Sequence, residues 1–185
     1  MTICKFLVTA GLAALAFPAA AAVTVIGSTD ARLCYEAADA RSIPSQYSVG
    51  RCDDALQRGD LTEYETVATY VNRGILKLRR GHIDDAIADF DIAIDRDPNE
   101  AEAYLNKGMA TLRMANGWEQ AVPLFDTAIA KETRRPAIAY YGRAVAHELG
   151  GNVKQAYRDY KQASLIEPRW RDPQNELARF SVRRN

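Results

Sequence analysis

The chain has 185 residues, of which 48% are hydrophobic, and its 24 Lys and Arg residues balance 24 Asp and Glu residues. A chain of this length and apolar content forms one compact domain and is not expected to be disordered. Its formal net charge of zero provides no overall field that would hold a polyanion. The composition therefore argues against a nucleic-acid-binding protein.

The first 22 residues have the pattern of a secretory signal peptide. A basic residue precedes an apolar run of about a dozen residues, and the small residues Ala20 and Ala22 favour cleavage before Val23. The alternative is a membrane anchor, which needs roughly 20 apolar residues, whereas Pro18 ends this run early. We therefore expect a cleaved signal peptide, a periplasmic or secreted protein, and no transmembrane anchor after cleavage.

Two cysteines, Cys34 and Cys52, remain once Cys4 is removed with the signal peptide. An even pair in a chain bound for an oxidising compartment predicts a disulfide. Its loop of about 18 residues would stabilise the fold by roughly 3 kcal/mol. The alternative is two buried free thiols. A redox motif is poorly supported, because catalytic dithiols usually have only two residues between them.

The chain repeats itself beyond residue 60, with a period of about 34 residues. The landmarks are, in the first unit, Tyr70, Gly74, Gly81, Ala86, Phe90, Ala93 and Pro98; in the second, Tyr104, Gly108, Ala121, Phe125 and Ala128; in the third, Tyr140, Ala144, Gly151, Ala156, Tyr160, Ala163 and Pro168. Over residues 67–168 this pattern resembles the tetratricopeptide repeat (TPR) family. The resemblance implies an all-α fold, a TPR-type α-solenoid of stacked antiparallel helix hairpins.

The residues of each unit support the same interpretation without the family name. Ile83, Ala86, Ile87, Phe90 and Ile94 recur at steps of three and four, which predicts a helix with one apolar stripe. Small residues in the first helix of each unit would let neighbouring helices approach, and the aromatic residue of the second helix would fill the space between them.

The flanking segments read as extensions of the stack that cap its open ends. The predicted organisation is a signal peptide (1–22), a flexible leader (23–30), a degenerate helical hairpin stapled by the two cysteines (31–66), three repeats (67–100, 101–136 and 137–170) and a C-terminal capping helix (171–185).

No constellation of residues predicts catalysis. His82 and His147 have no Cys or His at metal-ligand spacing around them. Asp84 and Asp85 lie at the predicted start of a helix, where capping explains their charge better than acid–base chemistry does. We therefore expect a protein that is not an enzyme and that binds no metal and no cofactor.

The family resemblance implies that the first helix of each repeat lines a concave groove. Asn72, Asn106 and Gly142 hold the same position in the three repeats. Asparagine there resembles the ladder of the O-GlcNAc transferase repeat arm, in which side-chain amides hold the backbone of an extended peptide. A side-chain amide both donates and accepts, so it can pair with a peptide unit of any sequence. The alternative is that asparagine at this position only stiffens the helix pair.

The rest of the predicted groove is mainly apolar, which suits an extended peptide with hydrophobic side chains or an amphipathic helix. The predicted peptide-binding residues are Val71, Asn72, Ile75, Arg79, Leu105, Asn106, Met109, Tyr141 and Val145. The basic residues that hold a C-terminal carboxylate in chaperone-binding repeats are absent. The alternative is that the flanking cap or the C-terminal helix fills this apolar floor.

Charge is also segregated along the chain. Arg73, Lys77, Arg79 and Arg80 cluster in one predicted helix, either as a solvated face or as a basic rim that steers an acidic partner. The last residues are rich in arginine and could contact anionic groups weakly.

The leading functional hypothesis is a non-catalytic protein–protein interaction module or adaptor of the bacterial periplasm or envelope, with a protein or peptide ligand. The second hypothesis is a structural envelope protein that self-associates through its apolar groove. An enzyme is the third. A repeat scaffold does not by itself identify its partner.

Overall fold

The computed structural model describes residues 21–25, 29–40 and 42–180, and within these ranges the chain is helical, with no strand. The predicted signal peptide, apart from its last two residues, and the last arginines of the chain lie outside the described residues. The described helices are α1 (Thr29–Asp39), α2 (Gln46–Arg58), α3 (Glu63–Arg79), α4 (Ile83–Arg96), α5 (Ala101–Thr111), α6 (Trp118–Ala130), α7 (Pro136–Leu149), α8 (Val153–Ile166) and α9 (Arg171–Leu177).

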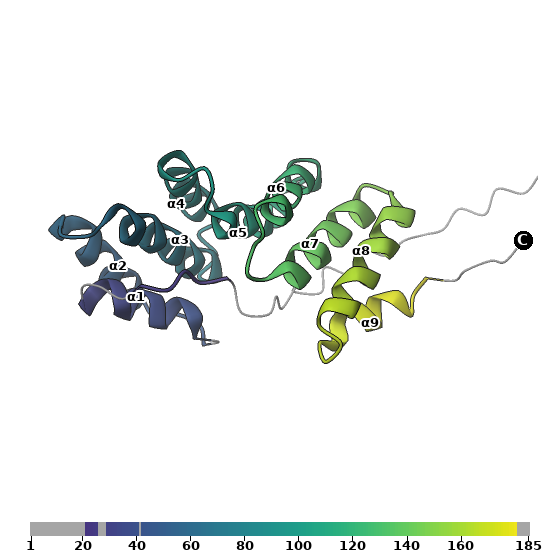
Figure 1. The fold of residues 1–185 in the computed structure, drawn as a ribbon, viewed down its shortest axis with the longest axis horizontal. Helices are drawn as coiled ribbons and strands as arrows, with labels where there is room; N and C mark the ends of the chain where they lie inside the picture. The colour runs from purple at the N-terminus through teal and green to yellow at the C-terminus, as the bar shows by residue number, and fades with distance from the viewer. Residues whose placement is uncertain (1–20, 26–28, 41, 181–185) are drawn as a thin grey trace, which may run out of the picture.

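Helices α3 to α8 form three antiparallel hairpins that stack side by side in an arch (Figure 1). This arrangement confirms the predicted all-α solenoid. Helix α3 begins at Glu63, four residues before the first predicted repeat, because Thr62 and Glu65 form a capping box. The Thr62 side chain accepts a hydrogen bond from the Glu65 backbone, and the Glu65 carboxylate accepts one from the Thr62 backbone.

The interior of the stack is built from aromatic residues that face small ones. Phe90, Phe125 and Tyr160 are at most 1% exposed. A Cβ atom on Gly74 would lie 2.5 Å from Cε1 of Phe90, and one on Gly108 would lie 2.9 Å from Cε1 of Phe125. These contacts confirm that the small residues of the first helices make room for the rings of the second helices.

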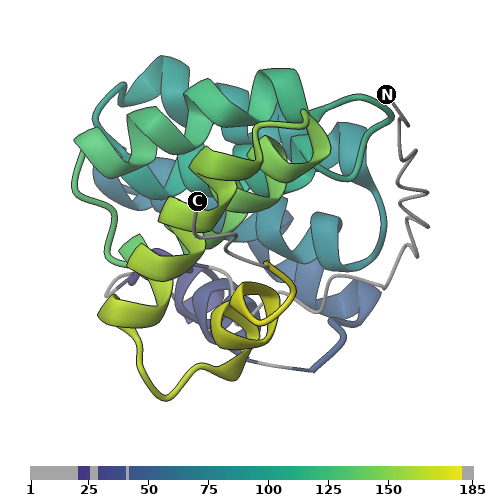
Figure 2. The same cartoon turned by 90° about the vertical axis from the view of Figure 1, so that its right-hand side faces the viewer.

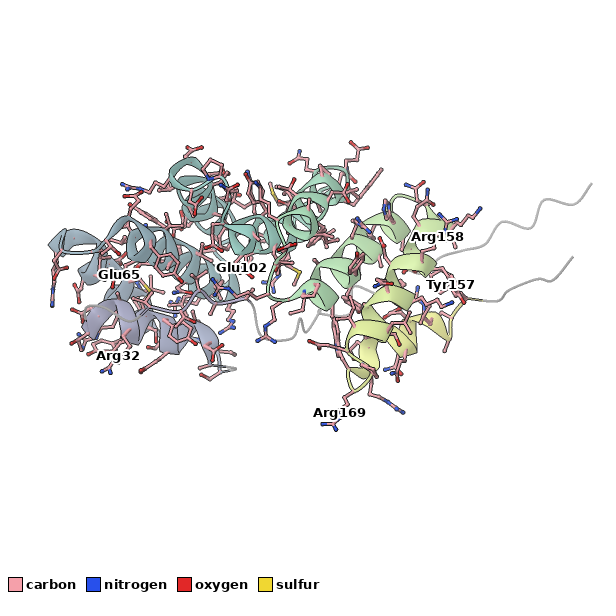
Figure 3. All side chains as sticks on the ribbon, viewed as in Figure 1. Arg32, Glu65, Glu102, Tyr157, Arg158 and Arg169 are labelled. Carbon is pink, nitrogen blue, oxygen red and sulfur yellow. A yellow bond between two sulfur atoms is a disulfide. The ribbon has the colours of Figure 1, made fainter. Side chains whose placement is uncertain are left out.

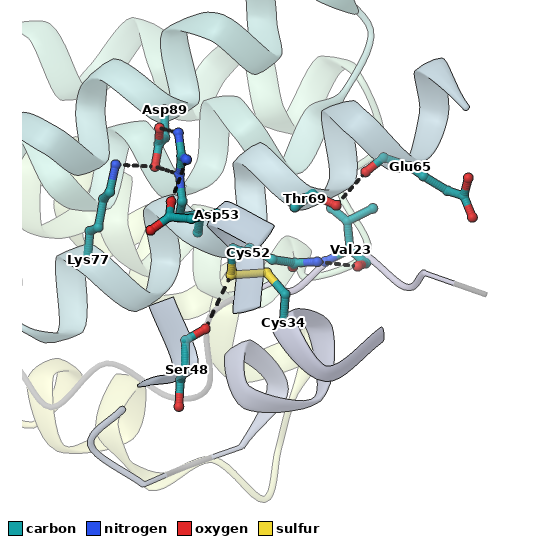
Figure 4. Close-up of a disulfide and its surroundings, with 11 residues drawn as sticks. Val23, Cys34, Ser48, Cys52, Asp53, Glu65, Thr69, Lys77 and Asp89 are labelled. Atoms are coloured by element: carbon teal, nitrogen blue, oxygen red, sulfur yellow. Dashed lines mark hydrogen bonds and ion pairs between the residues drawn. A yellow bond between two sulfur atoms is a disulfide. The ribbon is translucent and has the colours of Figure 1, made fainter. Parts of the chain in front are cut away.

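The hairpin of α1 and α2 caps the N-terminal end of the stack and packs on α3. The predicted disulfide is present: Cys34 on α1 and Cys52 on α2 are joined, with their Cα atoms 5.0 Å apart (Figure 4). Both residues are fully buried. The buried carboxylate of Asp30 adds a second link, because it forms ion pairs with two arginines of α2, at 2.7 Å from Arg51 and 2.6 Å from Arg58.

At the other end, α9 packs on α8. Seen end-on, α1 and α9 lie toward the same side of the stack (Figure 2). Figure 3 shows Arg158 and Arg169 pointing away from the helices at this end, and both are exposed.

The leader differs from the prediction of a flexible segment. Val23 and Val25 are 0% and 2% exposed, and the described residues 21–25 run in an extended conformation across α3 on the inner side of the arch (Figure 1). The physical reason is that the alternating valines pack against the hydrophobic core. Helix α1 also begins at Thr29, inside the predicted leader.

Candidate functional site: the inner groove of the repeat stack

The inner side of the arch, where the family resemblance predicts a groove, carries two asparagines of the first helices. Asn72 lies in the middle of α3 and Asn106 in the middle of α5, and their exposed fractions are 0% and 2%. A buried amide must find hydrogen-bond partners, because an unpaired one costs about 1–3 kcal/mol. The partners of these two amides therefore show which backbone groups lie against them in this chain.

Asn72 pairs with the backbone of the leader. Its Oδ1 accepts a hydrogen bond of 2.9 Å from the Val23 N–H, and its Nδ2 donates one of 2.7 Å to the Val23 carbonyl oxygen (Val23 is labelled in Figure 4). One side-chain amide thus satisfies both backbone groups of one residue, as a neighbouring strand does in a sheet.

Asn106 contacts the same segment two residues earlier. Its Nδ2 donates to the Ala21 carbonyl oxygen at 3.2 Å and also to the Glu102 carbonyl of its own helix at 2.8 Å. A third contact comes from Tyr64, whose hydroxyl donates to the Thr24 carbonyl oxygen at 3.2 Å. The extended segment is therefore held through its backbone from α5 to the start of α3.

The third repeat adds no amide to this row, because it has Gly142 at the equivalent position. A Cβ atom on Gly142 would lie 2.4 Å from Cζ of Phe125. A side chain at this position would displace the buried ring, so the packing of α6 against α7 explains why the row consists of two asparagines.

The apolar residues of the predicted groove are buried. Val71, Ile75, Leu105 and Met109 are at most 6% exposed and belong to one hydrophobic core with the leader valines. At the α7 end, the ring of Tyr141 lies 4.8 Å from the ring of Trp170, the residue that precedes α9. The segment before α9 thus covers the α7 end of the predicted groove. This agrees with the alternative that the chain's own flanking segments fill the apolar floor.

Arg79 does not point a free charge into the groove. Its Nη1 donates to the Ala40 carbonyl at 2.6 Å, just beyond the end of α1. Burial lowers the pKa of this guanidinium, while the charge of Asp39 opposes the shift. Arg80 likewise donates to the Pro44 carbonyl at 3.1 Å.

The other two cations of the predicted basic rim are paired with a buried carboxylate. Arg73 and Lys77 both contact Asp89 of α4, at 2.6 Å and 2.7 Å, and Arg73 also contacts Asp53 of α2 at 2.7 Å (Figure 4). The basic cluster therefore joins α3 to α2 and α4. An unpaired basic rim that would steer an acidic partner is not what the structure shows.

The structure also reveals a buried acidic pair that sequence reasoning missed. Glu100 and Glu102 are 8% and 3% exposed. Oε1 of Glu102 accepts hydrogen bonds from the Thr133 hydroxyl at 3.1 Å and the Arg134 backbone at 2.7 Å. Burial, together with the neighbouring Glu102 carboxylate, raises the pKa of Glu100 to about 7. Figure 3 shows Glu102 on α5, in the middle of the stack.

The two histidines, which were considered for catalysis or metal binding, lie at different helices. His82 is at the start of α4, where its Nδ1 lies 4.0 Å from Asp85. His147 is on α7, with Nε2 3.9 Å from Asp159. Among the described residues no group of three or more His, Cys, Asp or Glu side chains is arranged to hold a metal ion.

Comparisons with known proteins agree with this architecture. The family model of the tetratricopeptide repeat matches residues 71–114 and 111–165. No curated protein matches the chain. Among solved structures, the first TPR domain of the human RPAP3 protein is 24% identical over 60% of this chain and 87% of its own, with a TM-score of 0.57. A MamA RS-1 ArsTM double mutant is 17% identical over 71% of each chain, with a TM-score of 0.61.

The stacked helix hairpins define an α-solenoid repeat protein. The chain belongs to the tetratricopeptide repeat family. Its fold is that of a protein–protein interaction module, and such repeats are generally non-catalytic scaffolds. Within the part of the chain that is described, no helix has the length and apolar character needed to cross a membrane.

Proposed function

We propose that this protein is a non-catalytic adaptor of the bacterial periplasm or envelope that binds an extended peptide segment of a partner protein in the inner groove. One observation carries the proposal: the Asn72 amide pairs with both the N–H and the carbonyl of Val23, at 2.9 Å and 2.7 Å. This pairing supports the proposal, because it places on the inner side of the stack the polar groups that an extended backbone needs. Because the contacts are to backbone atoms, they are available to peptides of different sequence.

Two features support the proposed compartment. The disulfide between Cys34 and Cys52 suits an oxidising environment such as the periplasm. The first 22 residues have the pattern of a cleaved signal peptide. Mass spectrometry of the exported protein should find Val23 at its N-terminus, and a chain that retains residues 1–22 would contradict the proposed export.

The adaptor role is tested by affinity isolation from an envelope extract. The baits are the wild-type protein, the Asn72→Ala/Asn106→Ala variant, and the Asn152→Ala/Asn175→Ala variant, which changes two exposed asparagines outside the groove. Circular dichroism first establishes that all three are equally helical. A protein retained by the wild type and the control but lost from the groove variant supports the proposal. Identical retention by all three baits would contradict it.

A self-associating envelope protein is the second candidate, and the same contacts favour it. An extended segment that fits the groove of its own chain also fits the groove of a second copy, as in domain swapping. Light scattering coupled to size-exclusion chromatography separates the two candidates. A protein that stays monomeric at high concentration would exclude self-association.

A further inference from the structure

The leader has the side-chain pattern of a bound peptide. Ala21, Val23 and Val25 are 4%, 0% and 2% exposed, whereas Thr24 between the valines is exposed. Alternation of this kind means that an extended chain presents every second side chain to one surface. The inward side chains are small and aliphatic, and the hydrophobic core that receives them includes Val71 and Ile75 of α3.

The two kinds of contact have different roles in recognition. The hydrogen bonds of Asn72, Asn106 and Tyr64 with residues 21–24 all involve backbone atoms of that segment, so they fix its position and register without selecting its side chains. The core contacts select the side chains, because a charged or large residue at the place of Val23 would be buried without a partner or would not fit. The groove thus accepts an extended segment with small aliphatic residues at alternating positions.

The leader is also tethered close to its site. Only three residues separate Val25 from the start of α1 at Thr29. A short tether gives an intramolecular ligand an effective concentration on the order of millimolar. A partner peptide that needs the same amide must therefore compete with a ligand that is always present.

We propose that the extended segment 21–25, of which residues 23–25 remain after cleavage, is a built-in ligand of the groove, and that partner peptides bind in its place and register, with small aliphatic residues at every second position. This inference rests on the proposed peptide-binding function and adds the ligand class and its competitor. Signal-peptide cleavage before Val23 would remove Ala21 from Asn106 and leave Val23 on Asn72. In the processed chain, the leader therefore competes with partner peptides for the Asn72 amide.

The test uses the chain that begins at Val23 and a fluorescent peptide with the sequence of residues 20–26, with binding followed by fluorescence polarisation. The Val23→Asp/Val25→Asp variant should bind this peptide at least tenfold more tightly than the wild type, because its own leader no longer docks. The Thr24→Asp variant is the matched control, since Thr24 is exposed, and it should bind like the wild type. A peptide with Asp in place of both valines should not bind.

Three outcomes overturn the inference. The first is equal affinity of the wild type and the Val23→Asp/Val25→Asp variant, because the leader would then not compete. The second is absence of binding to that variant although its helical signal is unchanged. The third is a wild-type dimer that this variant converts to a monomer, because the leader would then come from a second copy. If the aspartates prevent folding, Val23→Thr/Val25→Thr, which keeps the side-chain shape, replaces them in the same comparison.

Failure of this inference is distinguishable from failure of the adaptor function. If the envelope extract yields a protein that depends on Asn72 and Asn106 but the peptide does not bind, the built-in ligand is wrong and the adaptor function stands. If the peptide binds as expected but no retained protein depends on the two asparagines, the groove accepts peptides and the adaptor function is wrong.

Discussion

Arg73 binds Asp89 through two parallel hydrogen bonds, from Nε at 2.9 Å and from Nη2 at 2.6 Å, and so joins the two helices of the first repeat. The same arrangement recurs in the third repeat, where Arg143 binds Asp159 at 2.8 Å and 2.7 Å. These hydrogen bonds, which outweigh the opposing effect of burial, raise the pKa of Arg143 above its usual range. The ion pairs are therefore part of the repeat architecture, because each one joins the two helices of a hairpin through two hydrogen bonds with a defined geometry.

Replacing Asp89 by Asn should destabilise the fold by roughly 3 kcal/mol, because Arg73 and Lys77 lose a buried carboxylate that is only 2% exposed. The matched control is Asp91→Asn, which breaks the more exposed pair with Lys107 and should cost less than about 1 kcal/mol. Chemical denaturation of both variants measures the difference. Equal effects of the two substitutions would show that the buried pair has no special role.

Gly142→Asn should not extend the row of groove asparagines. It should destabilise the protein by about 1–3 kcal/mol, because the new Cβ would lie 2.4 Å from the buried Phe125 ring. Gly50→Ala is the control: Gly50 lies inside α2, and beyond its own turn of helix no atom lies within 4 Å of the added Cβ, so this change should stabilise the protein by about 0.5–1 kcal/mol. Thermal melting of the two variants gives the comparison, and a Gly142→Asn protein as stable as the wild type would disprove the steric argument.

The repeat architecture could be predicted from the sequence because its signals are local and periodic. Gly74 and Phe90 have counterparts of the same type, Gly108 and Phe125, at nearly the same spacing in the second repeat, and their contact follows from the geometry of a helix hairpin. The position of one cysteine in each of two neighbouring predicted helices was equally informative. Both features are contacts between helices that follow one another in the sequence, so the sequence pattern is enough to predict them.

The occupant of the groove could not be predicted in the same way. The contact between Val23 and Asn72 joins residues 49 positions apart, and no repeat places the leader on α3. The alternation of Val23, Thr24 and Val25 was the available signal, since β-branched residues at every second position favour an extended conformation. The buried pair of Glu100 and Glu102 was also missed, because Thr133 and Arg134 approach it only in the folded stack.

The disulfide should stabilise the N-terminal cap by roughly 3 kcal/mol, because it closes a loop across 18 positions of the chain. The Cys34→Ser/Cys52→Ser variant should lose about this amount in urea unfolding. Adding a reductant to the wild type should reproduce the loss, whereas the reductant should leave the variant unchanged. A wild-type protein whose unfolding does not respond to reduction would show that packing of α1 and α2 alone secures the cap.

The buried acidic pair should make stability depend on pH. The pKa of Glu100 is raised from 4.5 to about 7 by burial and by Glu102, so between these values the folded state binds more protons than the unfolded state. The contribution of Glu100 to stability is therefore fully present below pH 4.5 and is lost as pH rises through about 7.

Glu100→Gln removes this titration and keeps an oxygen that can accept the Glu102 backbone hydrogen bond. Relative to the wild type, the variant should gain on the order of 1–3 kcal/mol between pH 4 and pH 8. Denaturant unfolding at several pH values measures this difference, with Glu119→Gln, at an exposed site on α6, as the control for a general change in charge. If the wild type and Glu100→Gln respond to pH identically, Glu100 does not carry the proton and the prediction is wrong.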